Sequence, residues 1–100
     1  MTVNVEKNNE IMTVMVEGEI NTITAPELSK QVEDLSGTRC LIFDLDQVRY
    51  VSSAGLRLFL ACQREMTASG GEMLIRNCNE FMMEIFESVG YDRIMQLSKK

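Results

Sequence analysis

The chain has 100 residues, of which 45% are hydrophobic, a formal net charge of −5 and no histidine. This length and hydrophobic content predict one compact domain, spanning residues 1–100, with a core of its own. The absence of histidine removes the commonest general base and metal ligand, and with it Ser-His and Cys-His nucleophile pairs and the usual zinc sites.

Charge and cysteine content restrict the partners and the compartment. The 10 Lys and Arg residues are scattered along the chain, so neither nucleic acid nor a membrane is expected as a partner. No apolar run approaches the roughly 18 residues of a membrane span, and no signal-peptide pattern is present. The three cysteines are far apart and form no CxxC pair, which favours free thiols in a reducing compartment. We therefore expect a cytoplasmic protein.

Two strand-like segments open the chain. Residues 3–7 and 11–17 are rich in apolar and β-branched side chains, and Asn8 and Asn9 lie between them. This pattern predicts a β-hairpin. Asparagine tolerates the left-handed backbone conformation that such a turn requires.

A short helix is predicted after the hairpin. Thr24 is a suitable N-cap, Pro26 fits the first turn, and Glu27 would complete a capping box with Thr24. Gly37 ends the helical pattern. The apolar residues at helical spacing are Leu28, Val32 and Leu35.

The middle of the chain predicts a central strand and a second helix. Residues 40–45 are almost continuously apolar, which is typical of a strand buried on both faces of a helix-covered sheet. From Ala54 the pattern becomes helical and stops near Gly70. Arg57 and Arg64 fall on the outer face of this helix, opposite its apolar side chains.

The last third predicts a strand, a helix and a final strand. Residues 73–76 form the first, Asn79 caps a helix that Gly90 closes, and residues 94–97 form the last. The apolar stripe of this helix consists of Phe81, Met82, Ile85, Phe86 and Val89. Alternating strands and helices after a hairpin predict an α/β domain, with a mostly parallel mixed sheet and helices packed on it.

Ser52 and Ser53 lie where the central strand passes into the second helix. Both are good N-cap residues, so capping alone would explain one of them. A nucleophilic role is disfavoured, because no base is near in the sequence and the GxSxG form is absent. A phosphate would be favoured by the free N–H groups and positive dipole end of the helix. Its charge of about −1.5 to −2 would weaken any complex that packs there.

The run from Leu45 to Leu60, with the motif Ser52-Ser53-Ala54-Gly55-Leu56 at a strand-to-helix turn, resembles the signature of STAS domains of bacterial anti-sigma factor antagonists. The resemblance extends over nearly the whole chain and implies a STAS-type fold, no enzymatic activity and no cofactor. It also implies partner switching. In the mechanism that the resemblance implies, the unphosphorylated domain binds an anti-sigma factor of the serine-kinase type and frees a sigma factor. Phosphorylation then releases the domain from that partner, and a serine phosphatase resets it.

The resemblance assigns phosphorylation to Ser53, two places before the glycine, with Ser52 as the alternative acceptor. The family commonly has aspartate at position 52 and often at position 21, where this chain has Ser52 and Asn21. Both exchanges remove negative charge near Ser53 while keeping hydrogen-bonding groups. The expected partner-binding residues are Asn21, Thr22, Ser52, Ser53, Ala54, Gly55 and Arg57.

Other interpretations remain open at this point. The same fold could serve as a constitutive interaction module or scaffold subunit, in which the serines only cap the helix. An enzyme with Ser53 or a cysteine as nucleophile has little support. Asp44 and Asp46 would share one side of an extended strand and could hold Mg²⁺, although solvated or turn-capping aspartates are favoured.

Overall fold

The computed structural model describes residues 1–100 as a five-stranded sheet with three α-helices and one short 3₁₀-helix. The elements in chain order are β1 (Thr2–Asn8), β2 (Ile11–Ile20), α1 (Ala25–Gln31), β3 (Cys40–Val51), α2 (Ser53–Ala68), β4 (Glu72–Cys78), α3 (Glu80–Ser88), η1 (Tyr91–Arg93) and β5 (Gln96–Lys99). The strands lie in sequential order, with β1 antiparallel to β2 and all other pairs parallel. The predicted mixed α/β sheet is confirmed. No helix has the length and apolar character needed to cross a bilayer.

The hairpin turn is the one expected from its asparagines. Asn8 pairs with Ile11 across the two-residue loop. Asn9 has a φ of 58°, in the left-handed region that asparagine tolerates better than most residues.

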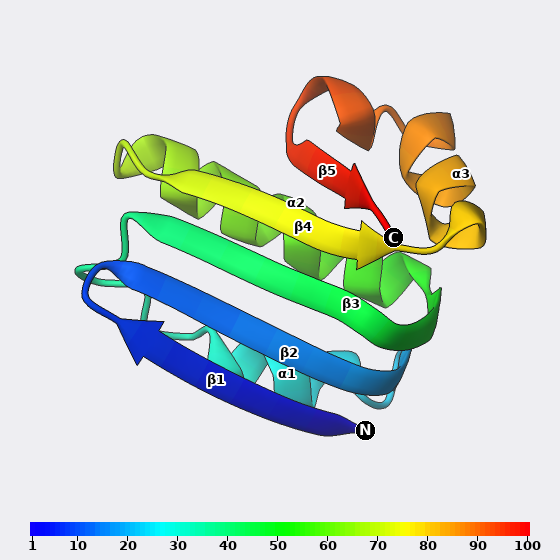
Figure 1. The fold of residues 1–100 in the computed structure, drawn as a ribbon, viewed down its shortest axis with the longest axis horizontal. Coiled ribbons are helices and arrows are strands. Elements are labelled where there is room, and N and C mark those ends of the chain that lie inside the picture. The colour runs from blue at the N-terminus through cyan, green and yellow to red at the C-terminus, as the bar shows by residue number, and fades with distance from the viewer.

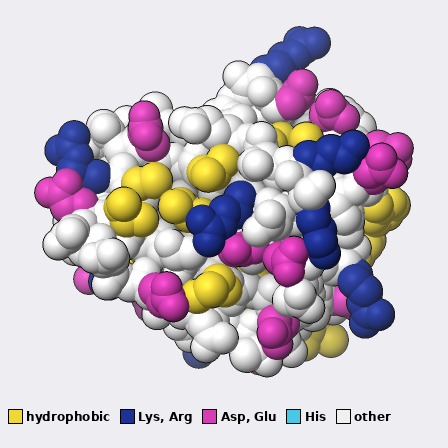
Figure 2. All heavy atoms as spheres, in the orientation of Figure 1, with side chains coloured by type: hydrophobic (Ala, Val, Ile, Leu, Met, Phe, Trp, Pro, Cys, Tyr) yellow, Lys and Arg dark blue, Asp and Glu magenta, His cyan; other side chains and the backbone are white.

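The core lies on one side of the sheet. Alternate residues of β2, β3 and β4 are buried in a single cluster, while the residues between them are half-exposed or exposed. Figure 1 shows α1 and α2 behind the sheet, with its other face open toward the viewer. On that open face, hydrophobic side chains lie among charged ones (Figure 2). The prediction that the central strand is buried on both faces is therefore wrong. Ile42, for example, points to the open face and is only half-buried.

The central strand is longer than its apolar run. It continues to Val51, and two register shifts against β2 interrupt the alternation of its side chains. After the first shift the buried residues follow at intervals of three, at Leu45, Val48 and Val51. Bulges of this kind bend and twist a strand locally. Here the two bulges lie in the part of β3 that leads to the turn containing the serines.

Several predicted boundaries shift. The first helix ends at Gln31 rather than near Gly37, although Val32 and Leu35 are buried beyond it. The last strand begins at Gln96 rather than residue 94, because the 3₁₀-helix precedes it. The cap of the third helix is confirmed, since the Asn79 side chain accepts a hydrogen bond from the Met82 N–H at 2.8 Å.

Candidate functional site

The two serines occupy different environments at the start of α2. Ser52 is the N-cap residue and Ser53 the first residue of the helix. Ser53 is exposed, whereas the Ser52 hydroxyl oxygen is buried and has no hydrogen-bond partner. No side chain caps α2. Ser52 therefore occupies the N-cap position, but neither serine side chain caps the helix as predicted.

The first turn of α2 keeps its backbone donors free. The first helical N–H with an acceptor is that of Leu56, which donates to the Ser52 carbonyl at 3.0 Å. The N–H groups of Ser53 and Ala54 have no such acceptor, and no acidic residue lies in the turn. Unpaired N–H groups and the positive end of the helix dipole favour an anion at this place.

Gly55 lets this turn approach the sheet closely. A Cβ atom on Gly55 would lie 2.7 Å from Ile20 Cγ2 and 2.7 Å from Val51 Cγ1, which is closer than packed carbon atoms lie. Gly55 is buried, so it contributes to the site by allowing the helix to pack against the ends of β2 and β3. The backbone supports this contact, because the Ser52 N–H donates to the Ile20 carbonyl at 2.8 Å.

The loop after β2 lies next to the serine turn and is organised by Asn21. Its side-chain oxygen accepts hydrogen bonds from the N–H groups of Ile23 at 2.9 Å and Thr24 at 3.0 Å. The predicted capping box at Thr24 is wrong. Thr24 instead donates its hydroxyl to the Glu19 carbonyl at 2.7 Å and accepts from the Asn21 N–H at 2.9 Å. Asn21 is half-buried, and its side chain serves this loop.

Exposed apolar side chains lie at the same edge of the sheet. Ile23 is 81% exposed, Tyr50 41% and Phe81 51%, and the rings of Tyr50 and Phe81 stack with their centroids 6.2 Å apart. Ile20 pairs with Val51, so the loop of Ile23 and the end of β3 are neighbours. We call the following exposed residues the serine-turn surface: Thr22, Ile23, Tyr50, Ser53, Arg57 and Phe81.

Sequence reasoning missed three members of this surface. Ile23 and Tyr50 are not among the residues predicted for the site, and Phe81 is predicted as part of the apolar stripe of the third helix. The stripe is only partly buried, because Met82 and Phe86 are in the core whereas Phe81 and Val89 are exposed. The sequence signal for Phe81 is its position, one residue after the first residue of the third helix. A side chain there lies at the end of the helix and not along its packed length.

Contacts from the C-terminal part hold the start of α2. The Tyr91 hydroxyl donates to the Leu56 carbonyl at 2.7 Å and so ties η1 to the first turns of α2. Burial of the ring raises the pKa of the Tyr91 hydroxyl above its ordinary value, despite the nearby Arg64 and Arg57. The hydroxyl therefore keeps its proton and remains a donor.

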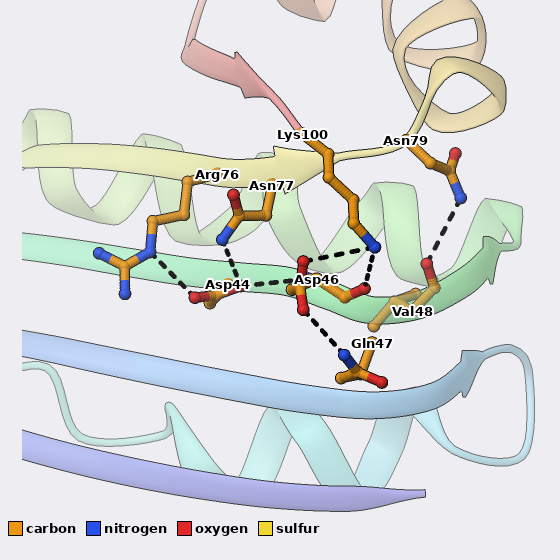
Figure 3. A network of polar contacts seen from close by, with 8 residues as sticks. All are labelled: Asp44, Asp46, Gln47, Val48, Arg76, Asn77, Asn79 and Lys100. Atoms are coloured by element: carbon orange, nitrogen blue, oxygen red, sulfur yellow. Dashed lines mark hydrogen bonds and ion pairs between the residues drawn. The ribbon is translucent and has the colours of Figure 1, made fainter.

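Asp44 stabilises the first bulge of β3 (Figure 3). One carboxylate oxygen accepts from the Asp46 N–H and from the Asn77 side chain, both at 3.0 Å. The other pairs with Arg76 Nε at 3.0 Å. Burial would raise the pKa of Asp44, but these donors outweigh it and the pKa is lowered.

The carboxylate of Asp46 is also occupied. It pairs with Lys100 at 3.3 Å and accepts from the Gln47 side chain at 2.8 Å. No group of three or more Cys, Asp or Glu side chains is arranged to hold a metal ion. Among the interpretations of Asp44, the turn-capping one matches its contacts.

A family model and curated relatives match nearly the whole chain. The family model described as the STAS domain matches residues 2–100. The anti-sigma-B factor antagonist of Bacillus subtilis is 28% identical over 101 residues, which cover 100% of this chain and 93% of that protein.

Solved structures share the fold. An anti-sigma factor antagonist from Mycobacterium paratuberculosis superposes with a TM-score of 0.86 at 24% identity, covering 99% of this chain and 86% of that one. The Bacillus cell fate determinant SpoIIAA in its phosphorylated form gives 0.78 at 17% identity, covering 99% and 93%. Since the family model spans nearly all of the sequence, the chain belongs to the STAS domain family.

Proposed function

We propose that this STAS domain is an anti-sigma factor antagonist that acts by partner switching. In its unphosphorylated form it binds an anti-sigma factor of the serine-kinase type through the serine-turn surface, and so frees a sigma factor. Phosphorylation of Ser53 by that kinase dissociates the complex. A separate serine phosphatase resets the domain, which acts as a binding protein and not as an enzyme.

The observation that carries this proposal is the position of Ser53. It is the exposed first residue of an uncapped helix, beside unpaired backbone N–H groups. A kinase can reach its hydroxyl, and the helix end accommodates the added charge. The buried hydroxyl of Ser52 lacks this access, which favours Ser53 over Ser52 as the acceptor.

The names of the relatives support the same function. The matching proteins of Bacillus subtilis and Staphylococcus aureus are named anti-sigma-B factor antagonists. SpoIIAA has been solved in an unphosphorylated and a phosphorylated form. The proposal extends both features to this chain.

The surroundings of Ser53 explain how one phosphate would dissociate a complex. Ile23, Tyr50 and Phe81 offer apolar area at the same edge, and such area binds a partner by excluding water. A phosphate of about −1.5 to −2 charge within that contact would have to lose its hydration. A cost of about 2.7 kcal/mol weakens binding about 100-fold.

The test uses the anti-sigma factor kinases of the same organism. Each is incubated with ATP and with the wild-type domain, Ser53→Ala or Ser52→Ala, and the products are mapped by mass spectrometry. We expect phosphate on the wild type and on Ser52→Ala, and none on Ser53→Ala. Calorimetry should show that Ser53→Asp weakens binding of the kinase at least about tenfold, or 1.4 kcal/mol.

A matched control is Ser36→Asp. Ser36 is also exposed, but it precedes β3 and so lies at the opposite edge of the sheet. Its substitution should leave binding unchanged. Phosphate on another residue, or equal affinity of the wild type and Ser53→Asp, would contradict the proposal and favour a constitutive interaction module of the same fold.

A further inference from the structure

We propose that Arg57 is the intramolecular partner of a phosphate on Ser53, so that phosphorylation engages the Arg57 guanidinium within the chain and makes it unavailable to a binding partner. The inference rests on the proposed function, because it concerns the phosphorylated form of the same site. It assigns to Arg57 a role in setting the state of the switch, in addition to contact with a partner.

The spacing along α2 brings the two side chains together. Ser53 is the first residue of a 16-residue helix, and Arg57 follows four residues later. Residues at this spacing lie on one face with their Cβ atoms about 5–6 Å apart, and the order of an anion before a cation is the favourable one. Both residues are exposed, so neither side chain has to leave the core.

The guanidinium of Arg57 has no competing acidic partner. The structure contains ion pairs of Arg39 with Glu10, Arg76 with Asp44, Lys99 with Glu80, and Lys100 with Asp46. Arg57 takes part in none of them and makes no side-chain hydrogen bond within the chain. The first turn of α2 has no acidic residue, so a phosphate on Ser53 would be the first anion there.

Arginine suits this role chemically. Its planar fork can donate two parallel hydrogen bonds to one phosphate, and it stays charged at every relevant pH. In the unphosphorylated domain, Arg57 offers a free positive charge on a chain whose formal net charge is −5. In the phosphorylated domain the same guanidinium pairs with the phosphate one turn earlier in its own helix. The modification thus adds negative charge to the surface and leaves no free positive charge at position 57.

The experiment needs neither a kinase nor a partner. Phosphoserine is incorporated at position 53 during translation, into the wild-type chain, Arg57→Gln and Arg57→Lys, and the phosphate is titrated by ³¹P NMR at low ionic strength. The second phosphate pKa, ordinarily about 6, should rise in Arg57→Gln by about 0.15–0.4 of a pH unit, as expected for a helical pair. Arg57→Lys should lie between the two.

Arg64 provides the matched control. It is an exposed arginine on the same helix, seven residues beyond Arg57, or about 10 Å further along the axis. Arg64→Gln should therefore titrate like the wild type. In the ¹H–¹⁵N spectrum, the Nε–H signal of Arg57 should move on phosphorylation, and that of Arg64 should not.

Failure of this inference can be told apart from failure of the proposed function. Equal phosphate pKa values in the wild type and Arg57→Gln, or an equal shift in Arg64→Gln, would overturn the role of Arg57 whatever a kinase does. If no kinase modifies Ser53 but the titrations differ as expected, the partner-switching proposal fails and the pairing of Arg57 with the phosphate stands.

Discussion

Gly55 sets how closely the serine turn approaches the sheet. Its missing side chain leaves room for Ile20 and Val51, the last residues of two neighbouring strands. A serine two residues earlier is thereby held at the sheet edge while its own side chain stays exposed. The glycine of the motif thus has a packing role that does not depend on any partner.

Substitution of Gly55 by alanine tests this role. In an open helical position the change would stabilise the protein by up to about 1 kcal/mol. Here we expect a loss of about 1–3 kcal/mol in the free energy of unfolding, because the new methyl group overlaps two core side chains. Urea denaturation measures the change. The double variant with Val51→Ala should lose less than the sum of the single losses, and strict additivity would count against the clash.

The bulged end of β3 determines where the site lies. Asp44 accepts the Asp46 N–H across the bulge and receives Arg76 and Asn77 from β4. Asn77 itself has a φ of 60°, which is uncommon for a residue with a side chain. One carboxylate thus joins the bulge of β3 to the end of β4, before β3 enters the serine turn.

The ionisation of Asp44 should make stability depend on pH. Its pKa is lowered in the folded chain, so its contribution is fully present above the unfolded value near 4 and is lost as the pH falls through the folded pKa. Asp44→Asn should cost about 1–3 kcal/mol at pH 7, and much less near pH 2. Urea titrations of both proteins at the two pH values measure this difference.

The control for this prediction is Asp92→Asn, at an exposed position of the 3₁₀-helix. Its stability should follow the wild-type dependence on pH. A cost of Asp44→Asn that is the same at pH 7 and pH 2 would show that the carboxylate charge does not stabilise the bulge.

The whole molecule has one covered and one open face, and its thiols report this arrangement. Cys62 and Cys78 are buried on the covered side, and burial raises their pKa values to about 12 and about 11. Cys40 is half-exposed at the start of β3, and its pKa is raised by burial and by Glu72. The thiolate is the reactive form, so access and ionisation both favour Cys40.

We expect one thiol per chain to react with Ellman's reagent in the folded protein at pH 8, and all three in urea. Cys40→Ser should abolish the native reaction and leave two thiols that react only after unfolding. Native labelling of Cys62 or Cys78 at a rate similar to that of Cys40 would contradict the one-sided packing of the sheet.

Local patterns predicted much of this protein. The hairpin turn at Asn9, the cap at Asn79 and the order of strands and helices depend on residues close together in the chain, and their conformational preferences act without the rest of the fold. The motif around Ser53 was also recognisable, because a strand-to-helix turn is a local event.

By itself, then, the sequence determined the types and order of the strands and α-helices, and the serine turn. The tertiary structure decided that only one face of the sheet is covered and that Phe81 joins Tyr50 at the surface. These outcomes depend on groups more than 30 positions apart or on which face a helix covers. Side-chain periodicity reveals that a face is apolar, but only packing determines what that face contacts.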